Sequence, residues 1–263
     1  MKSDINERNL IETVRRSPVG RSIWRSPTKH TPRDRAASHW SSFLLHIYPV
    51  KVRRGDIGFK YSWYLGVIST VLFGSLTLSG IYLMFFYVPS PAQAYTNIQT
   101  LQTEVAFGQY IRNVHRWSAH LMVLSVSAHM AKMFYRGAYK APREFNWVIG
   151  VILLALTLFM SFTGYLLPWD QLAYWAVTVG SEMAGYTPFV GEQVKETLIG
   201  GKVVGSATLL RFYVLHVAVM PVTMVIALMF HLWRWRKDSM LELERNEPVG
   251  HPAPASSEEL AGV

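Results

Sequence analysis

The strongest constraint on this chain is the absence of charge from three long stretches of its sequence. No Asp, Glu, Lys or Arg occurs in 61–88, 145–169 or 212–233. Each stretch exceeds the roughly 20 apolar residues that cross the hydrocarbon core of a bilayer as a helix. Charged residues make up 16% of the whole chain, against about a quarter in a typical soluble protein. The chain is therefore predicted to be an integral membrane protein.

A fourth apolar segment, 117–131, is shorter but has basic residues at both ends, including Arg116 and Lys132. Long basic side chains at helix ends can reach the membrane interface, so this segment is also predicted to cross the bilayer. The fold class predicted is an all-α membrane protein with a four-helix transmembrane bundle. The four spans are expected at about 61–88, 111–136, 146–167 and 209–235.

The net charge of +9 is concentrated on one side of these spans. Residues 1–60 contain 13 Lys and Arg against 5 Asp and Glu, whereas the connections 89–111 and 170–210 have only Lys195 and Lys202 as basic residues. Positive charge marks the cytoplasmic side of a membrane protein. Both termini are therefore expected in the cytoplasm, with the chain in a bacterial cytoplasmic membrane. The basic excess fits membrane lipid as a partner and no nucleic acid.

Three regions follow from this pattern. Residues 1–60 are predicted to be a cytoplasmic basic extension, with an interfacial helix at about 37–50 because its apolar residues recur every three or four positions. Residues 61–240 form the four-helix domain, and 241–263 are predicted to be a disordered cytoplasmic tail. Between spans, we expect a short helix in 89–110 and helical pieces in 168–208.

Four histidines lie within the second and fourth spans. His115 and His129 are 14 residues apart, and His216 and His231 are 15 apart. Both separations are close to four helical turns, so each pair occupies one side of its helix, with members roughly 21–22 Å apart along the axis. The second and fourth spans run in the same direction. His115 is thus expected opposite His216 near the outer side, with the other two opposite each other near the cytoplasmic side.

A single histidine inside a membrane is most often hydrogen-bonded to a neighbouring helix. Four histidines matched in depth favour another interpretation, in which two imidazoles ligate one haem iron from opposite sides. The chain has no cysteine, which excludes disulfides, iron–sulfur clusters and the C-x-x-C-H attachment of c-type haem. The cofactors predicted are two haem b groups, each held non-covalently by two histidines.

Glycine and arginine positions support this interpretation. Gly66 and Gly80 in the first span, and Gly150 and Gly164 in the third, repeat the separation of 14. A helix that passes against a haem face needs a residue without a side chain there, although small residues also serve ordinary helix packing. Arginines at the span ends can neutralise haem propionates or simply anchor the helices. These arginines are Arg112, Arg116, Arg143 and Arg211.

Several segments resemble one known family. The segments IRNVHRWSAHLMVLSVSAHM, YKAPREFNWVIGV, FTGYLLPWDQLAYWAV and LLRFYVLH are similar to cytochrome b of quinol-oxidising Rieske complexes. The resemblance covers about 60–240. The 15-residue histidine step, the PWDQ sequence and the presence of four spans resemble the cytochrome b6 form. In that form a separate subunit supplies the remaining helices.

The resemblance implies a di-haem subunit of a quinol:cytochrome c or plastocyanin oxidoreductase. Its electrons would cross from an outer quinol-oxidation site to a cytoplasmic-side quinone-reduction site, coupled to proton translocation, with quinone and quinol as substrates. By motif match, four residues would line part of the outer quinol pocket: Trp169, Asp170, Tyr174 and Ala176. The resemblance also implies a dimeric complex with three partners: a Rieske iron–sulfur protein, the subunit with the remaining helices, and a c-type cytochrome.

The sequence departs from the b6 form in two places. Where that form has a cysteine that binds an extra haem, this chain has Tyr64, and the extension before residue 50 has no counterpart. A PEWY-type motif, whose glutamate accepts the proton of quinol, is absent from the chain, so the chain is not expected to be active alone.

Two other classes of protein remain as alternatives. One is the di-haem membrane anchor of a dehydrogenase or hydrogenase, and the other is a transporter or scaffold whose histidines relay protons.

Overall fold

The regular secondary structure of the described residues is entirely helical. The structure is a computed structural model and describes residues 13, 14, 16, 17, 19, 20 and 59–246. Within these residues there is no strand, which confirms the predicted all-α fold class. The predicted interfacial helix at 37–50, most of the 1–60 extension and the tail from 247 lie outside the described residues.

The chain divides into two compact units. The larger unit contains Ser62–Arg136 and Ile149–Leu228. The smaller unit contains Gly137–Val148, the described residues before 62 and the described residues 229–246. Two long helices, α9 (Glu144–Leu166) and α13 (Met220–Asn246), have residues in both units. Because α13 reaches Asn246, residues 241–246, which were assigned to the predicted tail, are helical.

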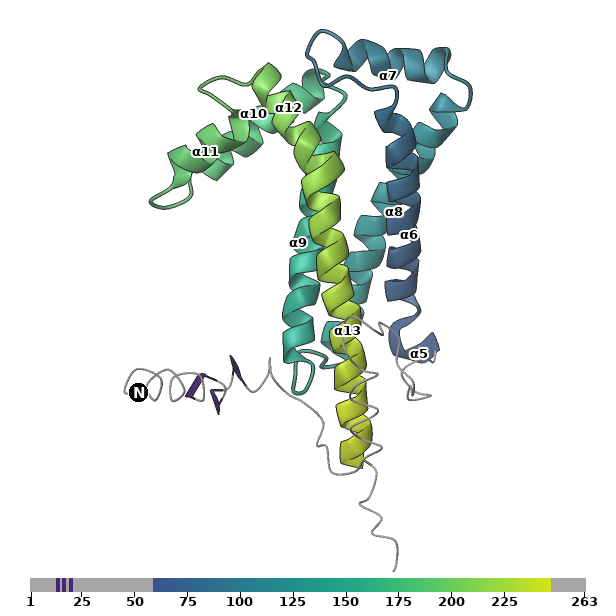
Figure 1. The fold of residues 1–263 in the computed structure, drawn as a ribbon, viewed down its shortest axis with the longest axis vertical. Helices are drawn as coiled ribbons and strands as arrows, with labels where there is room; N and C mark the ends of the chain where they lie inside the picture. The colour runs from purple at the N-terminus through teal and green to yellow at the C-terminus, as the bar shows by residue number, and fades with distance from the viewer. Residues whose placement is uncertain (1–12, 15, 18, 21–58, 247–263) are drawn as a thin grey trace, which may run out of the picture. The chain divides into compact units, whose positions relative to one another are not determined.

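In the larger unit, α6 (Leu65–Met84) and α8 (Gly108–Tyr135) run antiparallel, side by side (Figure 1). Two serine pairs join them, Ser69 with Ser125 at 2.9 Å and Ser75 with Ser118 at 3.2 Å between hydroxyl oxygens. The residue numbers of the paired serines increase along α6 and decrease along α8, as expected for antiparallel helices. Small hydroxyl side chains allow two membrane helices to approach closely and hydrogen-bond across their contact.

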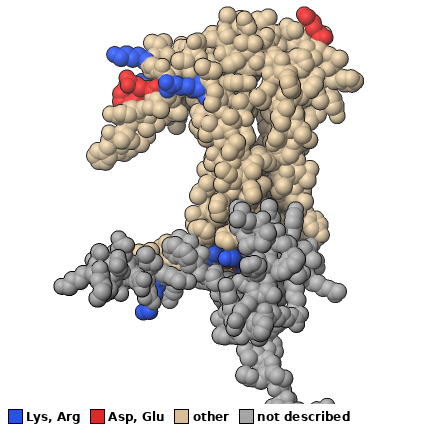
Figure 2. All heavy atoms as spheres, in the orientation of Figure 1, with Lys and Arg blue, Asp and Glu red and all other residues tan. Residues whose placement is uncertain are grey.

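Among the described residues, three helices are long and apolar enough to cross a membrane: Leu65–Met84, Glu144–Leu166 and the helix over Ser206–Asp238. On the face shown in Figure 2, the long helices of the larger unit expose uncharged side chains over their middle parts. The remaining predicted span, α8, has 28 residues and is long enough, but it does not meet the same standard of apolarity. The physical reason is its composition, because it carries Arg112, Arg116 and Lys132 as well as three histidines.

The helix over Ser206–Asp238 has three parts. These are α12 (Ser206–Val214), a π-helical turn η1 (Leu215–Val219) and the first part of α13. Near the end of α9, Phe162 contacts Phe212 of α12 edge to face, with ring centres 6.1 Å apart. Phe212 also belongs to the buried core with Leu166 and Val177, so this core ties α9, α10 and α12 together.

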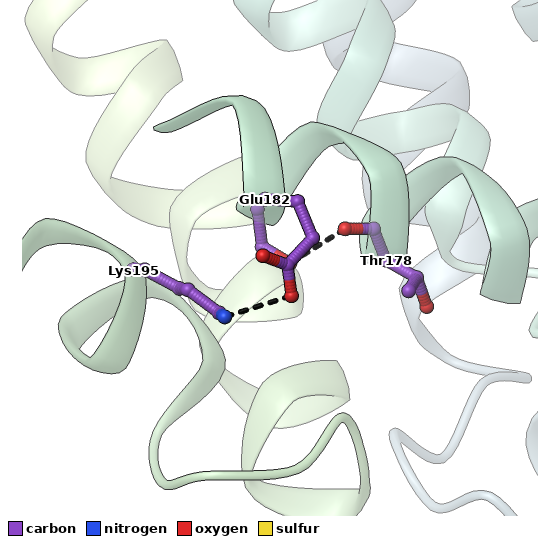
Figure 3. A network of polar contacts seen from close by, with 4 residues as sticks. Thr178, Glu182 and Lys195 are labelled. Atoms are coloured by element: carbon purple, nitrogen blue, oxygen red, sulfur yellow. Dashed lines mark hydrogen bonds and ion pairs between the residues drawn. The ribbon is translucent and has the colours of Figure 1, made fainter. Parts of the chain in front are cut away.

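Short helices form the connections between the long ones, as predicted. They are α7 (Ala94–Thr103), α10 (Gln171–Gly185) and α11 (Gly191–Ile199). Figure 3 shows the ion pair that joins α10 to α11, in which Lys195 Nζ lies 2.7 Å from Glu182 Oε1. The hydrogen bond and negative charge of Glu182 raise the pKa of Lys195. The pair therefore fixes the hairpin of these two helices with the lysine charged.

Candidate functional site

Two of the four predicted histidines meet within the larger unit. His115 lies on α8 and His216 on the turn η1, and their ring centres are 6.3 Å apart with the planes at 73°. They come from segments a hundred residues apart in sequence. The structure thus brings together the two histidines that were predicted to lie opposite each other near the outer side.

Hydroxyl groups determine which nitrogen of each ring carries the proton. Ser79 Oγ lies 2.9 Å from His115 Nδ1 and 2.6 Å from the carbonyl oxygen of Ser75, which can only accept, so the single serine hydrogen is donated to that carbonyl. The serine oxygen must therefore accept, and His115 Nδ1–H must donate. A neutral imidazole protonated at Nδ1 leaves a free lone pair on Nε2. His115 is therefore held in the tautomer that ligates a metal through Nε2.

The opposite histidine has the same arrangement on another helix. Thr163 Oγ1 donates to the carbonyl of Met160 at 3.0 Å and lies 3.1 Å from His216 Nδ1. The hydroxyl hydrogen is again committed elsewhere, so His216 Nδ1–H donates to the threonine. Both histidines of this pair thus present an unprotonated Nε2. Two such nitrogens are suitable donors for one metal ion placed between the rings.

Three of the paired glycines lie directly against histidine rings. A Cβ added at Gly164 would lie 2.6 Å from His216 Cε1, and one added at Gly80 would lie 3.3 Å from His115 Cε1. At Gly66 the added atom would be 3.4 Å from His129 Cε1. The first of these distances is a steric clash and the others are tight. The fourth glycine, Gly150, lies on α9.

The other two predicted ligands occupy different units. His129 is on α8 beside Gly66 in the larger unit, and its Nδ1 is buried without a hydrogen-bond partner among the described residues. His231 is on α13 in the smaller unit. In that unit Arg234 forms an ion pair with Asp238 at 2.9 Å and stacks over Phe145, with its Cζ 5.4 Å from the ring centre.

The predicted propionate-binding arginines lie at helix ends. Arg112 and Arg116 are in the first turns of α8, and Arg112 Nη1 donates to Gln102 Oε1 at 3.1 Å. Arg211, in the last turn of α12, donates to the carbonyl oxygen of Thr197 and lines an open pocket of about 550 Å³. Arg143 belongs to the smaller unit. Hydrogen bonds to the protein therefore already orient the guanidinium groups of Arg112 and Arg211.

The residues predicted to line a quinol pocket gather at the start of α10. Asp170 is the N-cap of this helix, and its Oδ1 accepts a hydrogen bond from the backbone of Ala173 at 2.8 Å. Trp169 and Tyr174 contact each other edge to face at 6.2 Å, and Ala176 packs against the buried core. The structure therefore gives Asp170 a capping role that the sequence analysis did not consider.

Comparison with known proteins identifies the family of the chain. Residues 56–239 match the family described as Cytochrome b/b6/petB, which is more than half of the chain. The chain belongs to the cytochrome b/b6 family. This confirms the resemblance seen in the sequence, and places the chain in a family whose members carry haem b.

Individual relatives agree with this assignment. Cytochrome b6 of Heliomicrobium gestii is 47% identical over 167 residues, which cover 64% of this chain and 78% of that protein. Cytochrome b6 of a Synechococcus strain (CC9902) is 43% identical over 192 residues, covering 70% and 88%. A solved structure titled "Hyperthermophilic respiratory Complex III" matches with a TM-score of 0.63 and 30% identity over 68% of this chain. This cytochrome b spans about half of that matched chain.

The residues around His115 and His216 fit a haem. An imidazole nitrogen binds a metal ion at about 2 Å and lies about 1.1 Å from its ring centre, so two rings that ligate one ion from opposite sides have centres roughly 6 Å apart. The observed separation is 6.3 Å. The described residues contain no group of three or more His, Cys, Asp or Glu placed to hold a metal ion. Two protein ligands are what a porphyrin leaves open, because its own nitrogens supply the rest.

Two residues of this site, Ser79 and Thr163, were not predicted from the sequence. Each immediately precedes one of the paired glycines, Gly80 and Gly164. The corresponding residues before the other two glycines are Leu65 and Ile149, which have no hydroxyl group. The sequence signal that could have predicted Ser79 and Thr163 is therefore a hydroxyl residue directly before one of the paired glycines.

Proposed function

We propose that this cytochrome b is the di-haem subunit of a quinol:cytochrome c or plastocyanin oxidoreductase. It would carry electrons across the membrane from an outer quinol-oxidation site to a cytoplasmic-side quinone-reduction site, coupled to proton translocation. The observation that carries the proposal is the meeting of His115 and His216, each with its Nδ1 against a hydroxyl oxygen, at a separation suited to a single metal ion. Membership of the cytochrome b/b6 family supports the same conclusion.

His115 and His216 would hold the outer haem, and His129 with His231 the cytoplasmic-side haem. The second pairing rests on sequence, since the separations of 14 and 15 residues place both partners about four turns below the first pair. Bound between two histidines, a haem supplies reversible one-electron transfer with no open position for dioxygen. Gly66, Gly80, Gly150 and Gly164 would leave room for the two groups. The basic residues Arg112, Arg116, Arg143 and Arg211 would neutralise their propionates.

We further propose that α8 crosses the membrane as the second of four spans. It runs antiparallel to α6 and hydrogen-bonds to it at Ser69 and Ser75, and α6 is long and apolar enough to span. A helix side by side with a spanning helix over this length occupies the same depth of the bilayer. Its histidines would then ligate the bound cofactors, and the basic residues near its ends would reach the two membrane interfaces. The charge distribution supports cytoplasmic termini.

Quinol would bind near the start of α10, beside Trp169, Tyr174 and Ala176. The only carboxylate in this group, Asp170, already accepts a backbone hydrogen bond as the N-cap. With no PEWY-type glutamate in the chain, the group that accepts the proton of quinol would come from the subunit with the remaining helices. A Rieske protein and a c-type cytochrome would complete a dimeric complex.

The exposed face of α10 supports such an assembly. Its apolar residues Leu172, Trp175, Val179 and Met183 recur at three- and four-residue intervals and are 56–68% exposed. Contiguous exposed apolar surface on a helix indicates contact with another protein or with lipid. The face is therefore a suitable site for a subunit of the complex.

Replacing one histidine ligand of each proposed haem, in separate variants, tests the proposal. In membranes that contain the whole complex, His231→Leu should reduce the haem content from two to one per chain and leave the pair at His115 intact. His216→Leu should remove the other haem. Pyridine haemochrome analysis gives the count, and the surface variant Glu192→Gln on α11 is the control. Retention of both haems in either histidine variant would show that the pairing by depth is wrong.

A further inference from the structure

The histidines at the two levels of α8 differ in what their Nδ1 atoms contact. His115 Nδ1 donates to Ser79 Oγ at 2.9 Å. His129 lies 14 residues further along the same helix. Its Nδ1 is buried and has no hydrogen-bond partner among the described residues. Both rings lie against a glycine of α6 in the same way. The difference is therefore a hydrogen bond and not the packing of the ring.

The outer level has this hydrogen bond on both sides. His216 Nδ1 donates to Thr163 Oγ1 at 3.1 Å, as His115 does to Ser79. Serine and threonine in helices commonly bond only to a carbonyl one turn back, as Thr77 does to Phe73. Ser79 and Thr163 do this as well, but each also accepts from a histidine. The two hydroxyls thus act on the ligands as acceptors.

An acceptor on Nδ1 changes the electronic character of Nε2. When a ligating imidazole donates its other N–H to an oxygen, electron density moves onto the ring and the ligating nitrogen becomes a stronger donor. A stronger donor stabilises the more positively charged ferric iron relative to the ferrous iron. Hydrogen bonding to the ligands is one of the means by which a protein sets the potential of a haem.

We propose that Ser79 and Thr163 are positioning residues that lower the reduction potential of the outer haem by accepting hydrogen bonds from its two ligands. The inference rests on the proposed function, in which His115 and His216 hold that haem. The inner level has no such acceptor at His129. The hydroxyl pair therefore acts on one haem of the two.

Thr163 can be replaced by two residues that separate the effect of its hydroxyl from that of its volume. Thr163→Val keeps the volume of this fully buried side chain and removes the hydroxyl, whereas Thr163→Ser keeps the hydroxyl. Ser79→Ala makes the same test on the opposite ligand. Thr77→Val on α6 is the control, because the Thr77 hydroxyl bonds only to Phe73 O and is exposed. The carbonyl of Leu76 lies beside the His115 ring and that of Met160 beside the His216 ring as further acceptors, so the two hydroxyl deletions should have effects of similar size.

The measurement is an optical redox titration of the assembled complex in membranes, together with a haem count. We expect Thr163→Val to shift the ferric-to-ferrous equilibrium of the outer haem at least threefold toward the ferrous form. This corresponds to a rise of roughly 28 mV for a one-electron couple. Thr163→Ser and Thr77→Val should leave the potential unchanged, and the inner haem should not shift in any of the variants.

The outcomes separate the inference from the proposed function. Two bound haems with an unchanged outer potential in both Thr163→Val and Ser79→Ala would overturn the role of the hydroxyls and leave the proposed function standing. Loss of the outer haem in Thr163→Val, with recovery in Thr163→Ser, would support the positioning role, and the potential is then read in Ser79→Ala. A colourless preparation of the unaltered chain would overturn the proposed function itself.

Discussion

At the scale of single residues, the outer histidine pair depends on side chains that are small or absent. Gly164 approaches His216 so closely that no Cβ fits without movement of the ring. Gly74, on α6, has open space where its Cβ would be. Two glycines of similar appearance in the sequence therefore have different roles, and only the first is required by a contact.

The substitution Gly164→Ala should displace the His216 ring and weaken or abolish binding of the outer haem. The added methyl would lie 2.6 Å from Cε1, and overpacking of this kind costs about 1–3 kcal/mol. Gly74→Ala is the matched control and should keep both haems. Haem content and the visible spectrum of the purified complex measure the difference. Equal haem content in the two variants would contradict the role given to Gly164.

At the scale of elements, the π-helical turn η1 explains the unequal histidine spacing. The separation is 14 residues on α8 but 15 between His216 and His231, and η1 contains His216. A π turn takes one residue more than an α turn, and such turns often occur at functional sites. In a regular α-helix one extra residue would rotate everything beyond it by about 100°. The turn absorbs this extra residue and preserves the rotational register of the helix.

Deletion of Ala218 should therefore be tolerated. The deletion removes one residue from η1, so the turn can become α-helical with a separation of 14, and both haems should remain. Deletion of Leu124 is the control, because α8 is α-helical between its histidines and has no extra residue to lose. That deletion would rotate His129 by about 100° relative to His115 and should remove one haem. The haem content per chain is measured in both deletion variants. An equal loss of haem from the two variants would refute the role of the π turn.

At the scale of the whole molecule, the complete absence of cysteine determines how cofactors can be held. The full chain contains none, so no thioether can attach a haem. Tyr64 stands at the start of α6, and its backbone is left-handed (φ 54). The described residues offer histidines, glycines and hydroxyls for non-covalent binding instead.

All haem of this cytochrome b should consequently leave the protein in acidified organic solvent. A denaturing gel stained for haem peroxidase activity should show no colour at the position of the chain. The pyridine haemochrome spectrum of the extract should be that of haem b. A relative with the cysteine, treated in parallel, serves as the positive control. Haem retained on the band, or a c-type spectrum in the pellet, would contradict this prediction.

The sequence alone determined the helices, their approximate limits and the cofactor class. Runs without charge, the histidine separations and the paired glycines are local properties of the chain, because a helix places residues by a fixed rise and rotation. The family could likewise be recognised from contiguous motifs such as PWDQ. Polarity limited this approach at α8, whose basic residues and histidines lower its apolar character although it packs along α6.

Only the tertiary structure decided which atoms meet. The contact of His115 with His216, the acceptors Ser79 and Thr163, and the capping role of Asp170 depend on the rotation and separation of segments far apart in sequence or on the geometry at a helix end. A hydroxyl in a helix has a carbonyl partner one turn back in almost any fold. Whether it also accepts from a ligand's Nδ1–H depends on a neighbouring helix, and no periodicity along one chain segment encodes that.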